Sequence, residues 1–167
     1  MSHGAVRTLS LAVLCLAVLC LAAAPAGAQQ PPLPCSADRL AGAWAYTMTG
    51  TFILPTGPVP AAAVGTFVST PAGEVEGSQH FSLAGTAGQE TVRGTFDDNG
   101  DCTGTMTLGL YHPSGTLLRT AVWAVVFDDN ARESRAIFKS LTLANGTNIP
   151  TVGTATARKL FTNPVGR

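Results

Sequence analysis

Hydrophobic and polar residues alternate with a period of two along most of the chain that follows residue 40. The segment 43–54 shows this best, because its large apolar side chains fall on even positions and its threonines on odd ones. The even positions hold Trp44, Tyr46, Met48, Phe52 and Leu54. Such alternation is typical of a β-strand that buries one face, so we predict a strand here with its even face inward.

Seven further stretches have the same strand character, and short runs rich in Gly, Pro, Asn and Asp separate them. They cover residues 61–70, 74–85, 89–96, 102–111, 116–127, 134–145 and 151–161. The run PTGPVP, residues 55–60, is predicted to break the chain between the first two strands. Every connection is short enough for an antiparallel hairpin, and no stretch offers the helix that a parallel crossover needs.

An all-β fold follows, with eight antiparallel strands within residues 41–162. Strands joined in sequence can close into an up-and-down barrel, which removes the unpaired edges of an open sheet. Glycines inside several strands suit the sharp coiling of a barrel wall. We therefore favour an eight-stranded barrel, and an open β-sandwich is the alternative.

Residues 1–28 have the pattern of a signal peptide. Arg7 precedes the apolar run 9–24, and APAGA then ends in the small-x-small pattern that signal peptidase recognises. We therefore expect export, to a secreted or periplasmic location. The mature chain is then expected to begin with an extended, proline-rich arm at 29–40 and to end with a short tail at 163–167. The apolar run is short for a membrane span, so no stable membrane anchor is expected.

Two cysteines, Cys35 and Cys102, remain once residues 1–28 are removed. An even pair of cysteines in an exported domain indicates a disulfide, and two free buried thiols are the alternative. The chain has neither a C-x-x-C motif nor a metal-type Cys/His cluster, so redox catalysis and zinc binding are not expected.

Charge is balanced and sparse, with ten Lys and Arg against ten Asp and Glu. Between Leu40 and Val92 only Glu74, Glu76 and Glu90 are charged. Because no basic patch is present, a nucleic-acid partner is not expected.

The stretch DDNGD raises the question of a metal site. Asp97, Asn99 and Asp101 match the first three ligand positions of a calcium-binding loop. The sixth position is Cys102 instead of glycine and the twelfth is Leu108 instead of glutamate, so the EF-hand pattern fails. The same residues favour a tight turn, so we predict a hairpin turn, with a weak surface calcium site as the alternative.

Catalytic patterns are absent from the sequence. His80 shares the polar face of its predicted strand with Ser78 and two glutamates, but successive same-face residues lie about 7 Å apart. His112 falls in the predicted turn YHPSG, and no G-x-S-x-G elbow, phosphate loop or dinucleotide fingerprint is present. We expect no catalytic residues, no metal and no cofactor.

Three segments carry a family resemblance: CSADRLAGAWAYTMTG (35–50), VRGTFDDNGDCTGTMTL (92–108) and GTATARKL (153–160). They resemble a group of small exported bacterial proteins of uncharacterised function with a G-T-[FY]…D-C-T-G-T run. That group is similar to calycin and allene-oxide-cyclase-like β-barrels. The resemblance implies a calycin-like barrel, and it supplies no catalytic residue.

A looser resemblance to lipocalins comes from GAW at 42–44. It implies that Arg158, on the last strand, packs over Trp44 and closes one end of the barrel. A core tryptophan with a solvent-facing arginine is the alternative.

Aromatic and thioether side chains are predicted to project into the barrel interior, which can be filled or can hold one small ligand. Tyr46 and Gln79 are the candidate polar anchors of such a pocket. The candidate ligand-binding residues are Trp44, Tyr46, Met48, Gln79, Phe81, Met106 and Trp123. The expected function is that of a non-catalytic exported barrel whose partner is a small hydrophobic molecule, or of a stable envelope protein. The alternative is a cofactor-free cyclase or isomerase, which an allene-oxide-cyclase-like shape implies.

Overall fold

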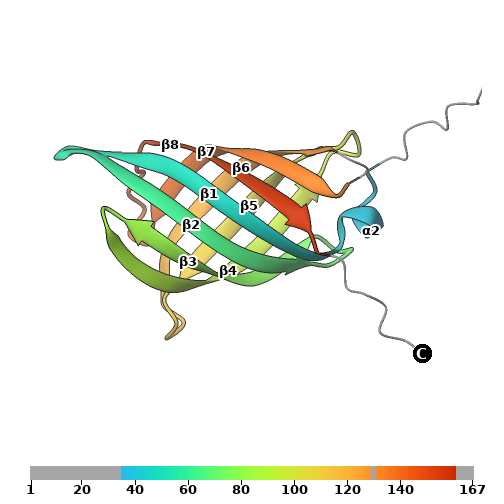
Figure 1. Ribbon diagram of the computed structural model, residues 1–167, viewed down its shortest axis with the longest axis horizontal. Coiled ribbons are helices and arrows are strands. Elements are labelled where there is room, and N and C mark those ends of the chain that lie inside the picture. Colours follow the sequence, from blue (N-terminus) through green and yellow to red (C-terminus); the bar gives the residue numbers. More distant parts are fainter. Residues whose placement is uncertain (1–34, 129–130, 161–167) are drawn as a thin grey trace, which may run out of the picture. The chain divides into compact units, whose positions relative to one another are not determined.

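Eight antiparallel strands form a closed barrel in the computed structural model, which describes residues 35–128 and 131–160 (Figure 1). The strands are β1 (Gly42–Leu54), β2 (Gly57–Ser69), β3 (Glu74–Leu83), β4 (Thr86–Asp98), β5 (Thr103–Tyr111), β6 (Leu117–Asp128), β7 (Glu133–Leu143) and β8 (Thr151–Lys159). Each strand pairs with the next in sequence. The predicted all-β, up-and-down barrel is confirmed, and the sandwich alternative is wrong. The predicted signal peptide at 1–28 and the tail at 163–167 lie outside the described residues.

The pairing of β1 with β8 closes the barrel. Its register runs from Trp44 opposite Lys159 to Phe52 opposite Thr151. Every strand therefore has two neighbours, and the closed sheet has no unpaired edge along this seam.

The predicted inward face of β1 is confirmed by burial. Phe52 is 9% exposed whereas its neighbour Ile53 is 44% exposed, and the threonines at 47 and 49 face solvent. The same alternation holds in β3, where Val75 and Gln79 are buried and the glutamates at 74 and 76 are exposed. Period two in the sequence thus identified the interior face of these strands.

The predicted break at residues 55–60 is wrong in its extent, because β2 begins at Gly57 and contains Pro58 and Pro60. Pairing between β2 and β3 begins only at Ala61, so the prolines lie in a part of β2 that pairs with β1 alone. The carbonyl of Pro60 points away from β1 and accepts a bond from the Ala84 amide at 3.0 Å. The nitrogen of Pro60 faces the same side, away from β1, so this proline removes no hydrogen bond from the ladder between β1 and β2.

One end of the barrel, which we call the plugged end, is closed by the N-terminal arm. Part of this arm is not extended as predicted, because Ala37–Leu40 form one helical turn, α2. The indole Nε1 of Trp44 donates to the carbonyl of Leu40 at 3.0 Å, and the Ser69 hydroxyl donates to the same carbonyl at 2.9 Å. The predicted disulfide between Cys35 and Cys102 is confirmed, and it ties this arm to the start of β5.

The residue over Trp44 is Lys159, so the predicted role of Arg158 is wrong. Lys159 is the register partner of Trp44 and shares its inward face, with Nζ 5.8 Å from the centre of the ring system. Arg158 lies opposite the outward-facing Ala45 and pairs with Glu133 at 2.8 Å on the surface. Lys159 also donates to the carbonyl of Arg39, at 2.6 Å, and partial burial lowers its pKa.

The stretch DDNGD leads into the hairpin turn between β4 and β5, as predicted, with Asp97 and Asp98 still paired in β4. Gly100 has a positive φ of 78°, and its amide donates to the carboxylate of Asp98 at 2.9 Å. Asp101 accepts bonds from the amide and the hydroxyl of Thr103, and these bonds lower the pKa of the Asp101 carboxyl. Two of the carboxylates thus stabilise the turn itself.

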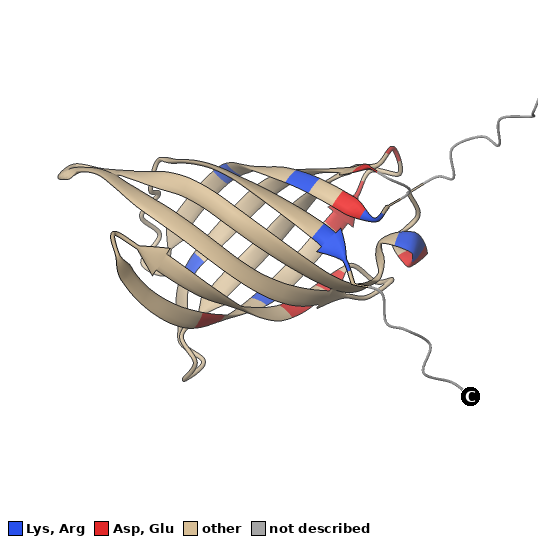
Figure 2. Cartoon of the chain, in the orientation of Figure 1, with Lys and Arg blue, Asp and Glu red and all other residues tan. Residues whose placement is uncertain are grey.

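Charged residues are unevenly distributed over the barrel (Figure 2). The whole of β1 and β2 carries none, and Figure 2 shows both strands in tan throughout. In the described part of the chain, no helix is long and apolar enough to cross a membrane.

Candidate functional site

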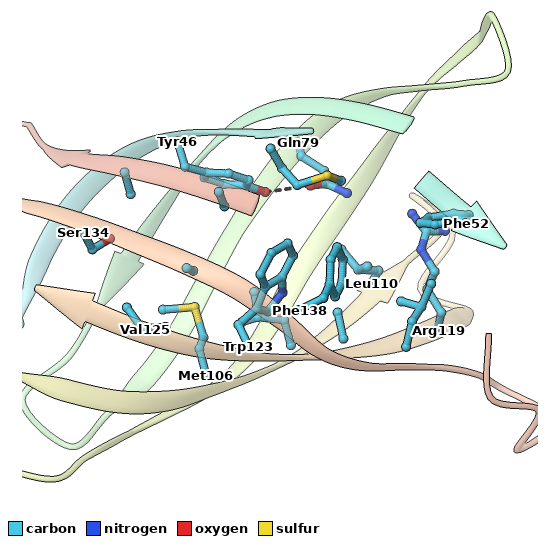
Figure 3. Close-up of a pocket in the computed structure, with 17 residues that line it drawn as sticks. Tyr46, Phe52, Gln79, Met106, Leu110, Arg119, Trp123, Val125, Ser134 and Phe138 are labelled. Atoms are coloured by element: carbon cyan, nitrogen blue, oxygen red, sulfur yellow. Dashed lines mark hydrogen bonds between the residues drawn. The ribbon is translucent and has the colours of Figure 1, made fainter. Parts of the chain in front are cut away.

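The barrel interior contains a cavity of about 70 Å³, which side chains from β1, β3 and β5 to β8 line. Most of the lining side chains are apolar, and the polar exceptions are Tyr46, Gln79, Arg119 and Ser134. Figure 3 shows Ser134 on one side of this cavity and Arg119 with Phe52 on the other. The interior is therefore neither fully packed nor an open channel.

Five of the seven candidate ligand-binding residues line this cavity. They are Tyr46, Met48, Gln79, Met106 and Trp123. Met48 and Met106 point inward yet are only half-buried, which marks the unfilled part of the interior. Trp123 packs against Phe138 with ring centres 3.6 Å apart.

Trp44 and Phe81 are not among the cavity-lining residues. Trp44 is 1% exposed and packs against Phe67 and Phe127 at the plugged end, with ring centres 6.1 and 5.7 Å away. Phe81 lies beneath the guanidinium of Arg119, whose Cζ atom is 5.8 Å from the ring centre. Both residues support the site from outside the cavity.

A chain of polar contacts crosses one wall of the cavity. The hydroxyl of Tyr46 donates to Gln79 Oε1 at 2.8 Å (Figure 3). Gln79 Nε2 in turn donates to Glu90 Oε2 at 2.7 Å. Arg119 Nη2 donates to the same Glu90 oxygen at 2.8 Å, forming a largely buried ion pair. Four strands therefore contribute to one network inside an otherwise apolar barrel.

Gly65 allows Tyr46 to reach Gln79. The three residues lie side by side on β1, β2 and β3, with Gly65 as the register partner of both others. A Cβ atom at Gly65 would lie 2.9 Å from the Tyr46 ring and 2.4 Å from the carbonyl oxygen of Ser78. Because Gly65 has no side chain, the Tyr46 ring has room to lie across β2.

Burial sets the chemistry of Tyr46. Removal from water, together with the nearby charge of Glu90, raises the pKa of the Tyr46 hydroxyl. The hydroxyl is therefore protonated at neutral pH and acts as a hydrogen-bonding group.

Glu90 and Arg119 are absent from the candidates that the sequence indicated. Their positions follow from parity, because Glu90 shares a face with Val92 and Phe96, and Arg119 with Trp123. Their residue types indicated an exposed position instead, since isolated charges are rarely found inside a protein. A glutamate and an arginine that each fall on an inward-facing position of their strands could have indicated a buried ion pair.

The two histidines lie away from this cavity. His80 is exposed on the outer face of β3, and His112 is exposed in the turn after β5, where its Nδ1 lies 2.8 Å from the Ser114 hydroxyl. Of the described residues that line the cavity, none is a histidine, an aspartate or a glutamate.

No protein-family model and no curated protein matches this chain. Among solved structures, EF1p2_mFAP2b bound to DFHBI matches with a TM-score of 0.51 at 14% identity, covering 75% of this chain and 97% of that chain. A redesigned β-barrel, mFAP1, bound to DFHBI, has a TM-score of 0.49 at 17% identity, with coverage of 74% and 98%. The S-type phycobiliprotein lyase CPES from Guillardia theta has a TM-score of 0.43 at 10% identity, with coverage of 76% and 92%.

At these identities the first match shows the fold alone. The chain has a closed eight-stranded barrel, as the sequence predicted.

Proposed function

We propose that this protein is an exported, non-catalytic barrel that binds one small apolar molecule in its interior. The observation that carries the proposal is the mainly apolar cavity with a few polar groups on its wall. Ligand sites in proteins are typically built in this way, since apolar surface provides binding energy and a few polar groups fix orientation.

The size of the cavity limits the ligand. A cavity of about 150 Å³ in an apolar core is enough to bind benzene, whereas this one measures about 70 Å³. Met48 and Met106 lie in the wall, and their unbranched side chains adapt to new shapes. We infer a compact ligand that gains room when these methionines move.

The first of the structural matches supports this proposal in one respect. That barrel is bound to DFHBI, so a barrel of this fold can form a complex with a small molecule.

Two features favour binding over the cyclase or isomerase alternative. The described cavity wall has no histidine or carboxylate that could exchange a proton with a substrate. The raised pKa of Tyr46 also keeps its hydroxyl from acting as a base near neutral pH.

Export is the second part of the proposal. The disulfide supports it, because such bonds persist in oxidising compartments outside the cytoplasm. Protein recovered from outside the cytoplasm should begin near Gln29 and should weigh two hydrogens less than the reduced chain. Free thiols at Cys35 and Cys102 in that sample would contradict this part.

Toluene tests the binding proposal, because it is compact, apolar and has no polar group. An NMR titration of the mature protein should show saturable shifts for residues that line the cavity. Met48→Trp should fill the cavity and abolish these shifts. Since it occupies empty space, the substitution should cost less than the roughly 1–3 kcal/mol expected in a packed core.

Thr49→Trp is the matched control, because Thr49 is the next residue of β1 and faces solvent. This variant should retain toluene binding. Strong destabilisation by Met48→Trp, combined with no toluene binding to the wild type, would show a filled structural barrel and overturn the proposal.

A further inference from the structure

The charges beside the cavity cancel. Among the described residues that line the cavity, Arg119 alone is charged, and its guanidinium pairs with Glu90 at 2.8 Å. The side chains are 16% and 1% exposed, so the pair is largely removed from water. A ligand in this cavity therefore meets a site whose net charge is zero.

A charged group on the ligand would be disfavoured at such a site. A carboxylate would leave water to meet an arginine that is already neutralised, and it would approach the negative charge of Glu90. An ammonium group would meet Arg119 in the same way. Burial of a charge without an available partner is costly, and a like charge nearby adds to that cost.

The network still has hydrogen-bonding capacity to offer. Arg119 has five N–H donors, and the bond to Glu90 uses one of them. The Tyr46 hydroxyl donates to Gln79, and its oxygen keeps its acceptor lone pairs. Glu90 Oε1 is buried without a hydrogen-bond partner, but Glu90 does not line the cavity, so Arg119 and Tyr46 supply the contacts to a ligand. An uncharged group that both donates and accepts complements this set.

We propose, resting on the binding function above, that the ligand carries an uncharged hydroxyl or amide group in the part of the cavity that Tyr46 and Arg119 line. The rest of the ligand is apolar and lies among the remaining side chains of the cavity wall. The ion pair then acts as a filter, which admits alcohols and amides and excludes carboxylic acids and amines in their charged forms.

Three derivatives of toluene test this inference: benzyl alcohol, benzoate and benzylammonium. They share the ring and differ in the charge of the attached group. In NMR titrations of the wild-type protein near neutral pH, benzyl alcohol should bind at least about tenfold more tightly than either ion, which corresponds to roughly 1.4 kcal/mol.

The variant Glu90→Gln removes the negative charge and keeps the shape of the side chain. Arg119 is then uncompensated, so benzoate should gain about tenfold in affinity, whereas benzyl alcohol should change little. Glu76→Gln is the matched control, because Glu76 pairs with Arg93 on the outer surface at 3.3 Å. It should leave the preference of the wild type unchanged.

The outcomes separate the two proposals. Benzoate or benzylammonium binding to the wild type as tightly as benzyl alcohol would overturn the charge filter, while toluene binding would leave the proposed function intact. If neither toluene nor any derivative binds, the proposed function fails and this inference fails with it. The ranking in the wild type decides the matter even if Glu90→Gln does not fold.

Discussion

The ring of Tyr46 on β1 crosses the bare backbone of Gly65 on β2, and its hydroxyl reaches Gln79 on β3, 2.8 Å away. Gly65→Ala should block this path, because a Cβ there would lie 2.9 Å from the ring and 2.4 Å from a backbone oxygen. Overpacking of this kind costs roughly 1–3 kcal/mol. Urea denaturation measures the loss, and Thr66→Ala on the outer face should cost much less.

Tyr46 should also make stability depend on pH in the alkaline range. Its pKa is raised in the folded state, so the folded protein holds this proton more tightly than the unfolded chain does. The stabilisation is fully present below the unfolded pKa of about 10 and is lost as pH rises towards the folded value. Urea midpoints at about pH 9 and pH 11 should therefore differ more for the wild type than for Tyr46→Phe. Tyr111→Phe retains Tyr46 and should behave as the wild type does.

Breaking the ion pair between Glu90 and Arg119 should cost far more stability than breaking a pair on the surface. Arg119→Met leaves Glu90 buried without a counter-charge, and we expect a loss of about 3 kcal/mol. Arg158→Met breaks a pair of the same 2.8 Å length on the surface, where the arginine is 75% exposed, and should cost less than about 1 kcal/mol. Equal losses in urea denaturation would contradict the interior role of Glu90.

The disulfide closes a loop between residues 67 apart in sequence. In the chain-entropy model such a bond stabilises the fold by roughly 4 kcal/mol. The double variant with Cys35→Ala and Cys102→Ala should lose stability of this order against the oxidised wild type. A loss below about 1 kcal/mol would show that the arm closes the barrel end equally well without the disulfide.

Calcium should have little effect on stability. The carboxylates of Asp98 and Asp101 already accept hydrogen bonds within the turn between β4 and β5. Millimolar calcium, or a chelator, should therefore shift the melting temperature by less than about 2 °C. A larger calcium-dependent rise would reveal linkage to a bound ion and favour the metal interpretation of DDNGD.

Alternation in the sequence was enough to predict the strands and their inward faces, because a buried face imposes period two directly. The closed sheet was favoured on other grounds, namely the short connections and the glycines within strands. Alternation also placed Tyr46, Met48 and Met106 in one interior. Alternation could not distinguish residues of the cavity from residues of the plugged end. Trp44 and Tyr46 both point inward, and Trp44 differs because the N-terminal arm packs against it.

The errors have physical causes of the same kind. Glu90 and Arg119 were overlooked because residue type outweighed parity, although each charge makes the other tolerable inside the barrel. Arg158 was placed over Trp44 by resemblance to lipocalins, although the register places Lys159 opposite Trp44. Which inward-facing residues lie beside each other depends on the register between strands that are distant in the sequence. Periodicity within one strand carries no information about that register.

The seam between β1 and β8 has a consequence for how the chain folds. It joins residues that are roughly a hundred positions apart, as in the contact between the Thr47 and Thr156 hydroxyls, 109 residues apart. Contacts of such long range form slowly, so β1 has an unpaired edge until the last strand has been made and docked. That edge carries no charge from Gly42 to Leu54, and uncharged edges recruit other chains. A chain that ends after β7 should aggregate instead of folding into a smaller domain.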